Sequence, residues 1–282
     1  MSNKKLDAEL ISRFTDLSDE KLQLFKKNPE FRDIIEEVER RQAIEEEKSD
    51  KTNFYLNKFI TQAPAMLTLK NKVRIVAEHD DPVLICGPTG TGKELIANAL
   101  HGKREGKFVD INCAGMPAEL IESELFGHVK GAFTDARTDK IGMMQAAQNG
   151  TIFLDEVGEM PMPMQSKLLR AIQEKRIRRV GATDSIEINC RIVCATHADL
   201  EMLADEGRFR RDLYWRISTV ELITTALGAR RGDIQLIVQH LDREERIKDL
   251  ESFCQGIKDL GGNVRSLQRA VRRFYLFEEY PH

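Results

Sequence analysis

Residues 82–94 read PVLICGPTGTGKE, an apolar run that passes into a glycine-rich turn and ends in a lysine and a glutamate. The apolar run is typical of a buried strand, and the following residues, ELIANAL, have the spacing of a helix. Gly87, Gly90 and Gly92 allow the backbone to turn tightly and to direct its N–H groups inward, where the helix N-terminus adds to a cradle for an anion. Lys93 supplies a positive charge for the outer phosphates of a nucleotide. The stretch predicts a phosphate-binding loop, called the P-loop below, made of Gly87, Pro88, Thr89, Gly90, Thr91, Gly92, Lys93 and Glu94.

A second stretch, TIFLDEV at 151–157, delivers two carboxylates to the end of an apolar strand. Ligands of parallel α/β sheets bind at the carboxyl ends of the strands, so Asp155 is placed to hold Mg²⁺ and Glu156 to polarise the water that attacks a γ-phosphate. An isolated Asp-Glu pair can equally begin a solvated turn, but the P-loop upstream favours an ATP site. Glu94 stands where such loops usually carry Ser or Thr, so the usual hydroxyl ligand of Mg²⁺ is missing.

The rest of the chain alternates short apolar runs with helical periods. Helical stretches such as KELIANALHG and PMQSKLLRAIQE separate apolar runs at 82–86, 107–113, 150–157 and 189–196. This alternation predicts an α/β fold, a parallel sheet with helices flanking both faces. The expected parts are a charged helical N-terminal arm over 1–53, the α/β core over 54–234 and a short helical lid over 235–282. The arm fits either a helical hairpin or a coiled coil, because apolar residues recur every seven positions but Pro29 interrupts them.

Composition excludes several classes of protein. Apolar residues make up 41% of the 282 positions and charged residues 32%, which indicates a soluble globular chain. A net charge of −3 argues against a protein whose main task is nonspecific nucleic-acid binding. No apolar run is long enough for a transmembrane helix, so we expect no membrane association. The 5 cysteines form no CxxC pair, which favours a reduced cytoplasm.

The sequence ELFGHVKGAFTDA at 124–136 resembles the GAFTGA signature of the AAA+ ATPase domain in bacterial enhancer-binding proteins, which activate the sigma-54 form of RNA polymerase. The resemblance runs from about Ile60 to Arg273 and includes the P-loop, where Glu after the lysine is a variant of the family itself. It also includes FVDINCAG, GTIFLDEVGEMP, QSKLLRAIQEKRIRRVG, RIVCATHADL, GRFRRDLYWRIS and GGNVRSLQ. It implies a P-loop AAA+ parallel sheet with a small helical lid, binding of ATP with Mg²⁺, and self-association into a ring, usually a hexamer.

The resemblance also implies roles for residues outside the P-loop and the acid pair. Asn112 matches an asparagine that holds the catalytic glutamate away from its water, although an Asn at a strand end can also satisfy local backbone. Thr196 and His197 match the first sensor of the γ-phosphate, where the family usually has Thr-Asn; a histidine after a strand can also be simply exposed. The remaining matches are Arg210 and Arg216, which reach into the neighbouring subunit's ATP site, and Arg265, the second sensor in the lid; each can also belong to a solvated basic helix face.

Phe133 and Thr134 match the loop tip that touches sigma-54 in the family. Asp135 replaces the second glycine of the signature; Asp adopts positive φ less easily than Gly and adds a negative charge. The chain stops at His282, soon after the lid, so we expect no C-terminal helix-turn-helix and no direct sequence-specific DNA binding. The expected function is an ATPase that remodels sigma-54 RNA polymerase. Two alternatives are a regulatory module that co-assembles with a full-length activator without remodelling activity of its own, and an AAA+ ATPase redirected to another protein partner.

Overall fold

The computed structural model describes Phe31, Ile34 and residues 51–281. The helices expected in the N-terminal arm fall outside these residues. The chain divides into two compact units, Met1–Lys51 and Thr52–His282, and the second contains everything described below. Within residues 51–281, every helix is too short or too polar to span a membrane.

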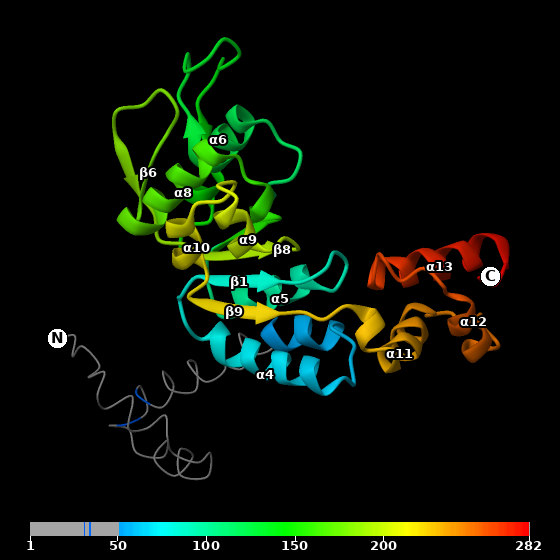
Figure 1. Ribbon diagram of the computed structural model, residues 1–282. Helices are drawn as coiled ribbons and strands as arrows, with labels where there is room; N and C mark the ends of the chain where they lie inside the picture. Colours follow the sequence, from blue (N-terminus) through cyan, green and yellow to red (C-terminus); the bar gives the residue numbers. More distant parts are fainter. Residues whose placement is uncertain (1–30, 32–33, 35–50, 282) are drawn as a thin grey trace. The chain divides into compact units, whose positions relative to one another are not determined.

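A five-stranded parallel sheet forms the centre of the second unit (Figure 1). The strand order is β2-β5-β8-β1-β9. The four strands expected from the apolar runs are present, so the predicted α/β fold is confirmed; the edge strand β9 was not predicted. The strands are β1 (Val83–Cys86), β2 (Phe108–Asn112), β5 (Thr151–Asp155), β8 (Arg191–Thr196) and β9 (Val220–Ile223).

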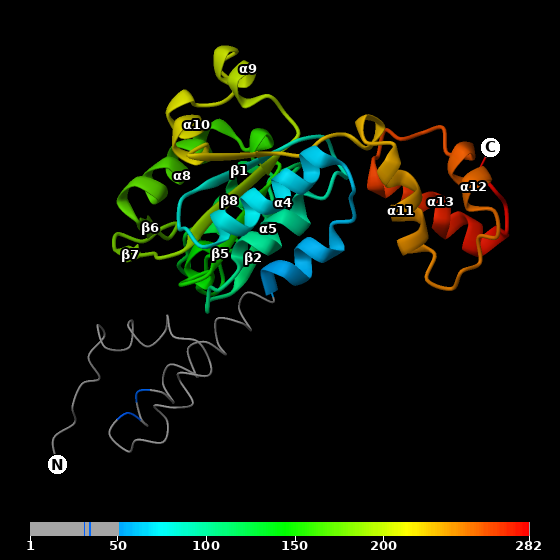
Figure 2. The same ribbon diagram turned by 90° about the horizontal axis from the view of Figure 1, so that it is seen from below.

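Helices cover both faces of this sheet (Figure 2). Successive side chains of a strand point to opposite faces. Leu154 and Cys194 therefore pack with the apolar side of α6–α10, whereas Phe153 and Val193 pack with α4 and α5. Burial on both faces explains why the strands read as continuous apolar runs. The helices are α4 (Pro64–Ala77), α5 (Lys93–His101), α6 (Ala118–Phe126), α7 (Met143–Ala146), α8 (Met162–Glu174), α9 (Leu200–Asp205) and α10 (Arg211–Ile217), with a 3₁₀ turn, η1 (Val157–Glu159), after β5.

Two small antiparallel sheets support the loop that carries the GAFTDA sequence. The strands β3 (Gly127–His128) and β4 (Lys140–Ile141) frame this loop, which projects beyond α6 (Figure 1). The hairpin of β6 (Arg176–Arg178) and β7 (Ser185–Glu187) lies beside it. Val129 N–H donates to the carbonyl of Val180 (3.1 Å), just beyond β6, so the base of the loop is held by the hairpin.

The C-terminal part of the second unit is helical and has its own apolar core. It consists of α11 (Gly232–Leu241), α12 (Leu250–Gly256) and α13 (Val264–Phe277), preceded by the 3₁₀ turn η2 (Leu227–Ala229). Phe253, Leu267 and Phe274 are buried in this core, and Phe253 and Phe274 pack edge to face (5.6 Å). The expected domain boundary between 234 and 235 lies inside α11 and stays a prediction.

A buried ion pair joins the start of α11 to the P-loop. The Arg230 Nη1 to Asp233 Oδ2 distance is 3.0 Å, and both side chains are almost fully buried. Asp233 also accepts hydrogen bonds from the Thr61 hydroxyl (2.6 Å) and from the Gln62 N–H (2.7 Å). Arg230 Nη2 donates to the carbonyl of Thr91 in the P-loop (3.4 Å). Three segments that are distant in sequence therefore meet at this pair.

We predict that Asp233→Asn destabilises the fold at neutral pH and by less in acid. Burial opposes ionisation of Asp233, but hydrogen bonds from Thr61, Gln62 and Arg230 hold the pKa of its carboxyl below the usual value. A carboxylate with a depressed folded-state pKa stabilises the fold fully above its unfolded pKa of about 3.9, and the contribution is lost as the pH falls through the folded value. Because the variant leaves Arg230 buried without its counter-charge, the free energy of unfolding should fall by roughly 3–5 kcal/mol at pH 7.

Urea unfolding of the parent and the variant at pH 7 and at pH 3 provides the measurement. Asp205→Asn is the matched control, because it breaks an exposed ion pair with Arg211 and should cost less than about 1 kcal/mol. An equal difference between parent and Asp233→Asn at both pH values would contradict the assignment.

Candidate nucleotide-binding site

Four strand ends meet at the carboxyl edge of the sheet. In the parallel register, Cys86 at the end of β1 lies beside Thr196 at the end of β8, and Asn112 at the end of β2 lies beside Asp155 at the end of β5. The P-loop leaves β1 at this edge, and the Gly87 N–H donates to the carbonyl of Thr196 (3.1 Å). The structure therefore brings together the two stretches that the sequence analysis singled out.

The P-loop has a conformation that only glycine fits at two positions. Gly90 has φ of +77° and Gly92 has φ of +103°, both in the left-handed region. A Cβ on Gly92 would lie 2.7 Å from the Phe59 ring, and one on Gly90 would lie 2.3 Å from the carbonyl oxygen of Gly262. Within the described chain, the backbone N–H groups of Gly90, Thr91 and Gly92 donate no hydrogen bond. They are available to a chain of phosphates, together with the N-terminus of α5.

Lys93 lies over this loop, and its ammonium group is held by neighbouring groups. The side chain is only 7% exposed, and Nζ donates to the carbonyl of Gly87 (2.8 Å). The same Nζ is 3.7 Å from Oε1 of Glu156. The lysine of the P-loop and the second acid of the pair therefore face the same space.

Asp155 has the chemistry of a ligand for a hard cation. Burial raises the pKa of its carboxyl, and the negative charge of Glu156 raises it further, whereas Lys93 and Arg265 oppose these effects. A divalent cation would relieve the repulsion between the two carboxylates, and carboxylate oxygens suit Mg²⁺. Glu94 is exposed at the start of α5. The P-loop donors and Asp155 thus fit a nucleotide phosphate chain and its Mg²⁺.

Glu156 is hydrogen-bonded to His197. Its Oε2 accepts from Nδ1 of His197 (2.6 Å) and from the backbone N–H of the same residue (3.1 Å). The expected partner, Asn112, instead accepts a hydrogen bond from the Ala114 N–H (2.8 Å), and no Asn112–Glu156 bond occurs among the described residues. Thr196, expected beside His197 as a sensor, is buried and its hydroxyl accepts from the Ala198 N–H (3.0 Å).

The lid meets the P-loop through Asn263, which the sequence analysis did not identify. Its Nδ2 donates to the carbonyl of Thr89 (2.9 Å), and its Oδ1 accepts from the N–H of Leu227 (2.6 Å). The next residue, Val264, donates its N–H to the carbonyl of Gly90 (3.0 Å). Asn263 has a positive φ of 51°, which Asn tolerates better than most residues. The GGN turn before a helix was the signal in the sequence that could have revealed it.

The three arginines expected at the site differ in their surroundings. Arg265, in the first turn of α13, is close enough to lower the pKa of Asp155. Arg210, at the N-terminus of α10, makes a two-pronged contact with Asp212 (2.9 and 2.6 Å). Arg216, in the last turn of α10, is exposed, and its guanidinium has no partner within the described residues. Of the two candidate arginine fingers, Arg216 alone is free to meet another molecule.

The GAFTDA loop presents Phe133, Thr134 and Asp135 to solvent. The Phe133 ring is 45% exposed and packs edge-on against the His128 ring (4.9 Å), which the Ser123 hydroxyl holds (2.8 Å). Asp135 does not have a positive φ, in contrast to Gly131 in the same loop. The backbone of this loop therefore does not require glycine at position 135, and the remaining departure is an exposed side chain with a negative charge.

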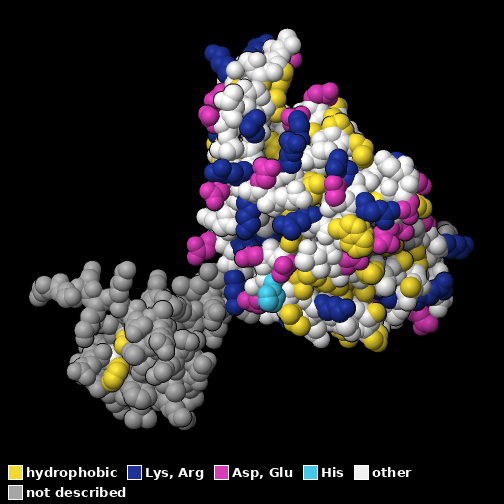
Figure 3. Space-filling model, turned by 60° about the vertical axis from the view of Figure 1, so that its left-hand side comes forward, with side chains coloured by type: hydrophobic (Ala, Val, Ile, Leu, Met, Phe, Trp, Pro, Cys, Tyr) yellow, Lys and Arg dark blue, Asp and Glu magenta, His cyan; other side chains and the backbone are white. Residues whose placement is uncertain are grey.

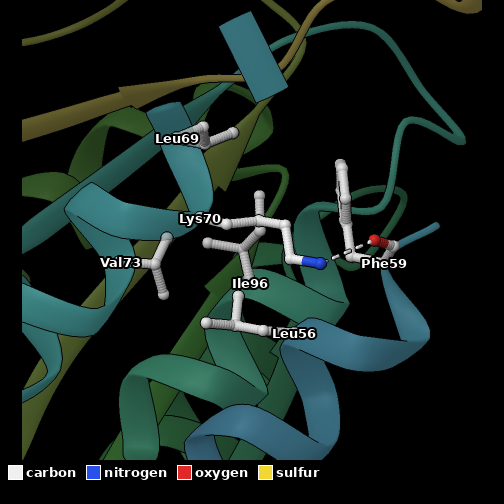
Figure 4. A pocket seen from close by; sticks show the side chains of 6 residues that line it. All are labelled: Leu56, Phe59, Leu69, Lys70, Val73 and Ile96. Atoms are coloured by element: carbon white, nitrogen blue, oxygen red, sulfur yellow. Dashed lines mark hydrogen bonds between the residues drawn. The ribbon is translucent and has the colours of Figure 1, made fainter. Parts of the chain in front are cut away.

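A small, mostly apolar pocket lies behind the P-loop. It is lined by apolar side chains, and the ammonium of Lys70 reaches the Phe59 carbonyl (3.3 Å; Figure 4). Burial, helped by Arg74, lowers the pKa of Lys70. The other lining residues are Leu56, Leu69, Val73 and Ile96. The ammonium of Lys70 is already bonded, and the Phe59 ring, which lines the pocket, lies against Gly92 of the P-loop.

On the surface, basic and acidic side chains are interspersed on the face shown in Figure 3. No basic stripe of the kind that follows a nucleic-acid backbone stands out on that face. The strongest candidate for a functional site within the described residues is the carboxyl edge of the sheet, where Lys93 and Glu156 face each other beside the P-loop.

A P-loop and an acid pair at the edge of a five-stranded parallel sheet, with a helical lid on the P-loop, define an AAA+ nucleotide-binding domain. Residues 59–223 match the family of the sigma-54 interaction domain. Since this match covers more than half of the chain, the protein belongs to that family.

Similar proteins are transcriptional regulators. The transcriptional regulatory protein GlrR of Escherichia coli K12 is 45% identical over 234 residues, which cover 79% of this chain and 53% of GlrR. The response regulator protein PilR of Pseudomonas aeruginosa is 42% identical over 239 residues, which cover 78% and 52%. The crystal structure of NtrX from Brucella abortus in complex with ATP has a TM-score of 0.70 and 28% identity, and the match covers 94% of this chain and 61% of that one. The chain thus spans about half the length of the curated relatives it matches.

Proposed function

We propose that the protein binds ATP with Mg²⁺, hydrolyses it within a ring of subunits, and uses the energy to move the GAFTDA loop against the sigma-54 form of RNA polymerase. The observation that carries the proposal is the 3.7 Å approach of Lys93 Nζ to Glu156 Oε1 beside a P-loop with unbonded N–H groups. The family match and the ATP complex of NtrX support the same nucleotide.

In this proposal each residue of the site has a separate task. The N–H groups of the P-loop and Lys93 bind the phosphates, and Asp155 holds Mg²⁺, which supplies charge neutralisation at the phosphates when bound. Glu156 accepts the proton of the attacking water. Arg265 senses the nucleotide from the lid.

In this proposal the ring supplies an arginine finger to each site from a neighbouring subunit. Arg265 belongs to the lid, and Arg210 is paired with Asp212, so Arg216 of a neighbouring subunit completes the charge stabilisation. Arg210 acts there only after release from Asp212. Through this arginine, each subunit responds to the nucleotide bound in the site of its neighbour.

The partner surface is the tip of the GAFTDA loop. Phe133 supplies an exposed apolar contact and Thr134 a polar one. Because Asp135 places a carboxylate at this tip, its desolvation weakens the contact with sigma-54 unless a cation of the partner meets it.

We predict that Glu156→Gln binds ATP like the parent but hydrolyses it roughly 10²–10⁴-fold more slowly, the usual contribution of a general base. Arg216→Ala should also be inactive. An equimolar mixture of the two variants should recover hydrolysis, because the glutamate of one subunit can meet the arginine of the other. Release of phosphate from each variant and from the mixture is the measurement.

The matched control mixes Arg216→Ala with the double variant Glu156→Gln/Arg216→Ala, which can complete no site. Parent-level hydrolysis by Glu156→Gln would disprove the role of the base. A mixture no more active than the control would disprove the role in trans. A parent chain with no hydrolysis at all would favour the regulatory module.

We predict that Asp135→Asn and Asp135→Gly increase the capture of sigma-54 to a similar extent. Since Asp135 has no positive φ, its backbone does not require glycine, and Asn removes the negative charge while it keeps the size of the side chain. Capture in the presence of ADP and aluminium fluoride, measured on a sizing column, should rise about tenfold if the penalty is near 1.4 kcal/mol.

Phe133→Ala should abolish capture, whereas Leu120→Ala, which removes a similarly exposed apolar side chain from α6, should not. A gain in Asp135→Gly alone would mean that the size of the side chain or the freedom of the backbone matters, and not the charge. No capture by any variant would favour an ATPase directed to another partner.

A further inference from the structure

The backbone of Glu156 has a conformation that few side chains adopt. Its φ of 52° and ψ of 49° lie in the left-handed region, directly after β5. A residue with a side chain stays there when its surroundings hold it, and such residues concentrate at functional sites. The Glu156 N–H donates to Oδ1 of Asp155 (3.1 Å), which fixes the turn. With the backbone fixed, the direction of the Glu156 carboxylate depends on the groups that bind it.

Two strand ends flank β5, and each offers a polar residue. β2 ends in Asn112 on one side, and β8 is followed by His197 on the other. The amide oxygen of Asn112 is used by the Ala114 N–H. His197 donates twice to the same oxygen of Glu156, from Nδ1 (2.6 Å) and from its backbone N–H (3.1 Å). The glutamate is therefore held from the β8 side.

The two oxygens of Glu156 consequently have different surroundings. Oε2 is occupied by both donors of His197. Oε1 faces Lys93 Nζ at 3.7 Å, on the side of the P-loop. Two donors on one oxygen restrict rotation of the carboxylate, so Oε1 remains directed at the place where the phosphates would lie.

We infer, on the basis of the proposed ATPase function, that His197 is the positioning residue of the catalytic base: its ring and backbone N–H hold Oε2 of Glu156 so that Oε1 receives the proton of the attacking water. The ring acts through Nδ1, two bonds from Cβ. The side-chain nitrogen of Asn is also two bonds from Cβ, whereas that of Gln is three bonds away. Asn should therefore replace His197 in this task, and Gln should not.

The experiment measures kcat and KM for ATP hydrolysis by His197→Ala, His197→Asn and His197→Gln. We expect kcat to fall roughly 10–100-fold in His197→Ala and His197→Gln, the size of effect that misplacement of a catalytic group produces, with KM changed less than about twofold. His197→Asn should recover kcat to within a few-fold of the parent. The His197 side chain is 47% exposed, so thermal unfolding should be unaltered, and His240→Ala on the exposed side of α11 is the control.

A double-variant cycle separates positioning from other roles. In Glu156→Gln, addition of His197→Ala should cause no further loss, because the group it positions is already disabled. The inference would be overturned if His197→Ala kept the kcat of the parent or changed only KM. It would also be overturned if His197→Asn and His197→Gln lost kcat equally, or if the losses in the double-variant cycle were additive. The proposed function fails separately, when Glu156→Gln retains parent activity or the parent has none.

Discussion

The parallel register of β5, β8 and β1 is the constraint on which the site depends. It brings the ends of these strands to one edge of the sheet. The P-loop, Asp155 and Thr196 therefore meet there, although they are far apart in the sequence. A shift of β5 by one residue would turn its buried side chains to the opposite faces, against both apolar clusters. The same packing that stabilises the sheet therefore holds the acid pair beside Lys93.

The P-loop is held by its neighbours through backbone and buried hydroxyl groups. The Thr91 hydroxyl bonds that of Thr224 at the end of β9 (2.7 Å), and Asn263 bonds the carbonyl of Thr89. Arg230 adds a bond from the segment before α11. Since these bonds come from β9, the connecting segment and the lid, any rotation of the lid must break or remake contacts with the P-loop. This gives the nucleotide site a direct mechanical connection to the lid.

Sequence reasoning succeeded where one local pattern determined the outcome. Continuous apolar runs predicted four strands, and glycine spacing before Lys93 predicted the P-loop. β9 was missed because it is an edge strand with exposed Glu221, which breaks the apolar pattern. The hydrogen-bond partner of Glu156 could not be predicted, because it depends on which segments pack together. The Arg230–Asp233 ion pair was missed for the same reason, and because charged residues between two domains usually suggest exposure to solvent. The φ of Asp135 depends on how the loop closes on the β6–β7 hairpin, which no short pattern reports.

The central claim is that the carboxyl edge of this sheet binds ATP. Isothermal titration calorimetry with ATP and Mg²⁺ tests it most directly, on the full chain, on Lys93→Ala and on Lys72→Ala, an exposed lysine of α4. The account predicts one ATP bound per chain, affinity at least about tenfold lower in Lys93→Ala because a charge-assisted hydrogen bond contributes about 1.5–3 kcal/mol, and no change in Lys72→Ala. Absence of binding by the parent, or equal affinity in Lys93→Ala and the parent, would contradict it.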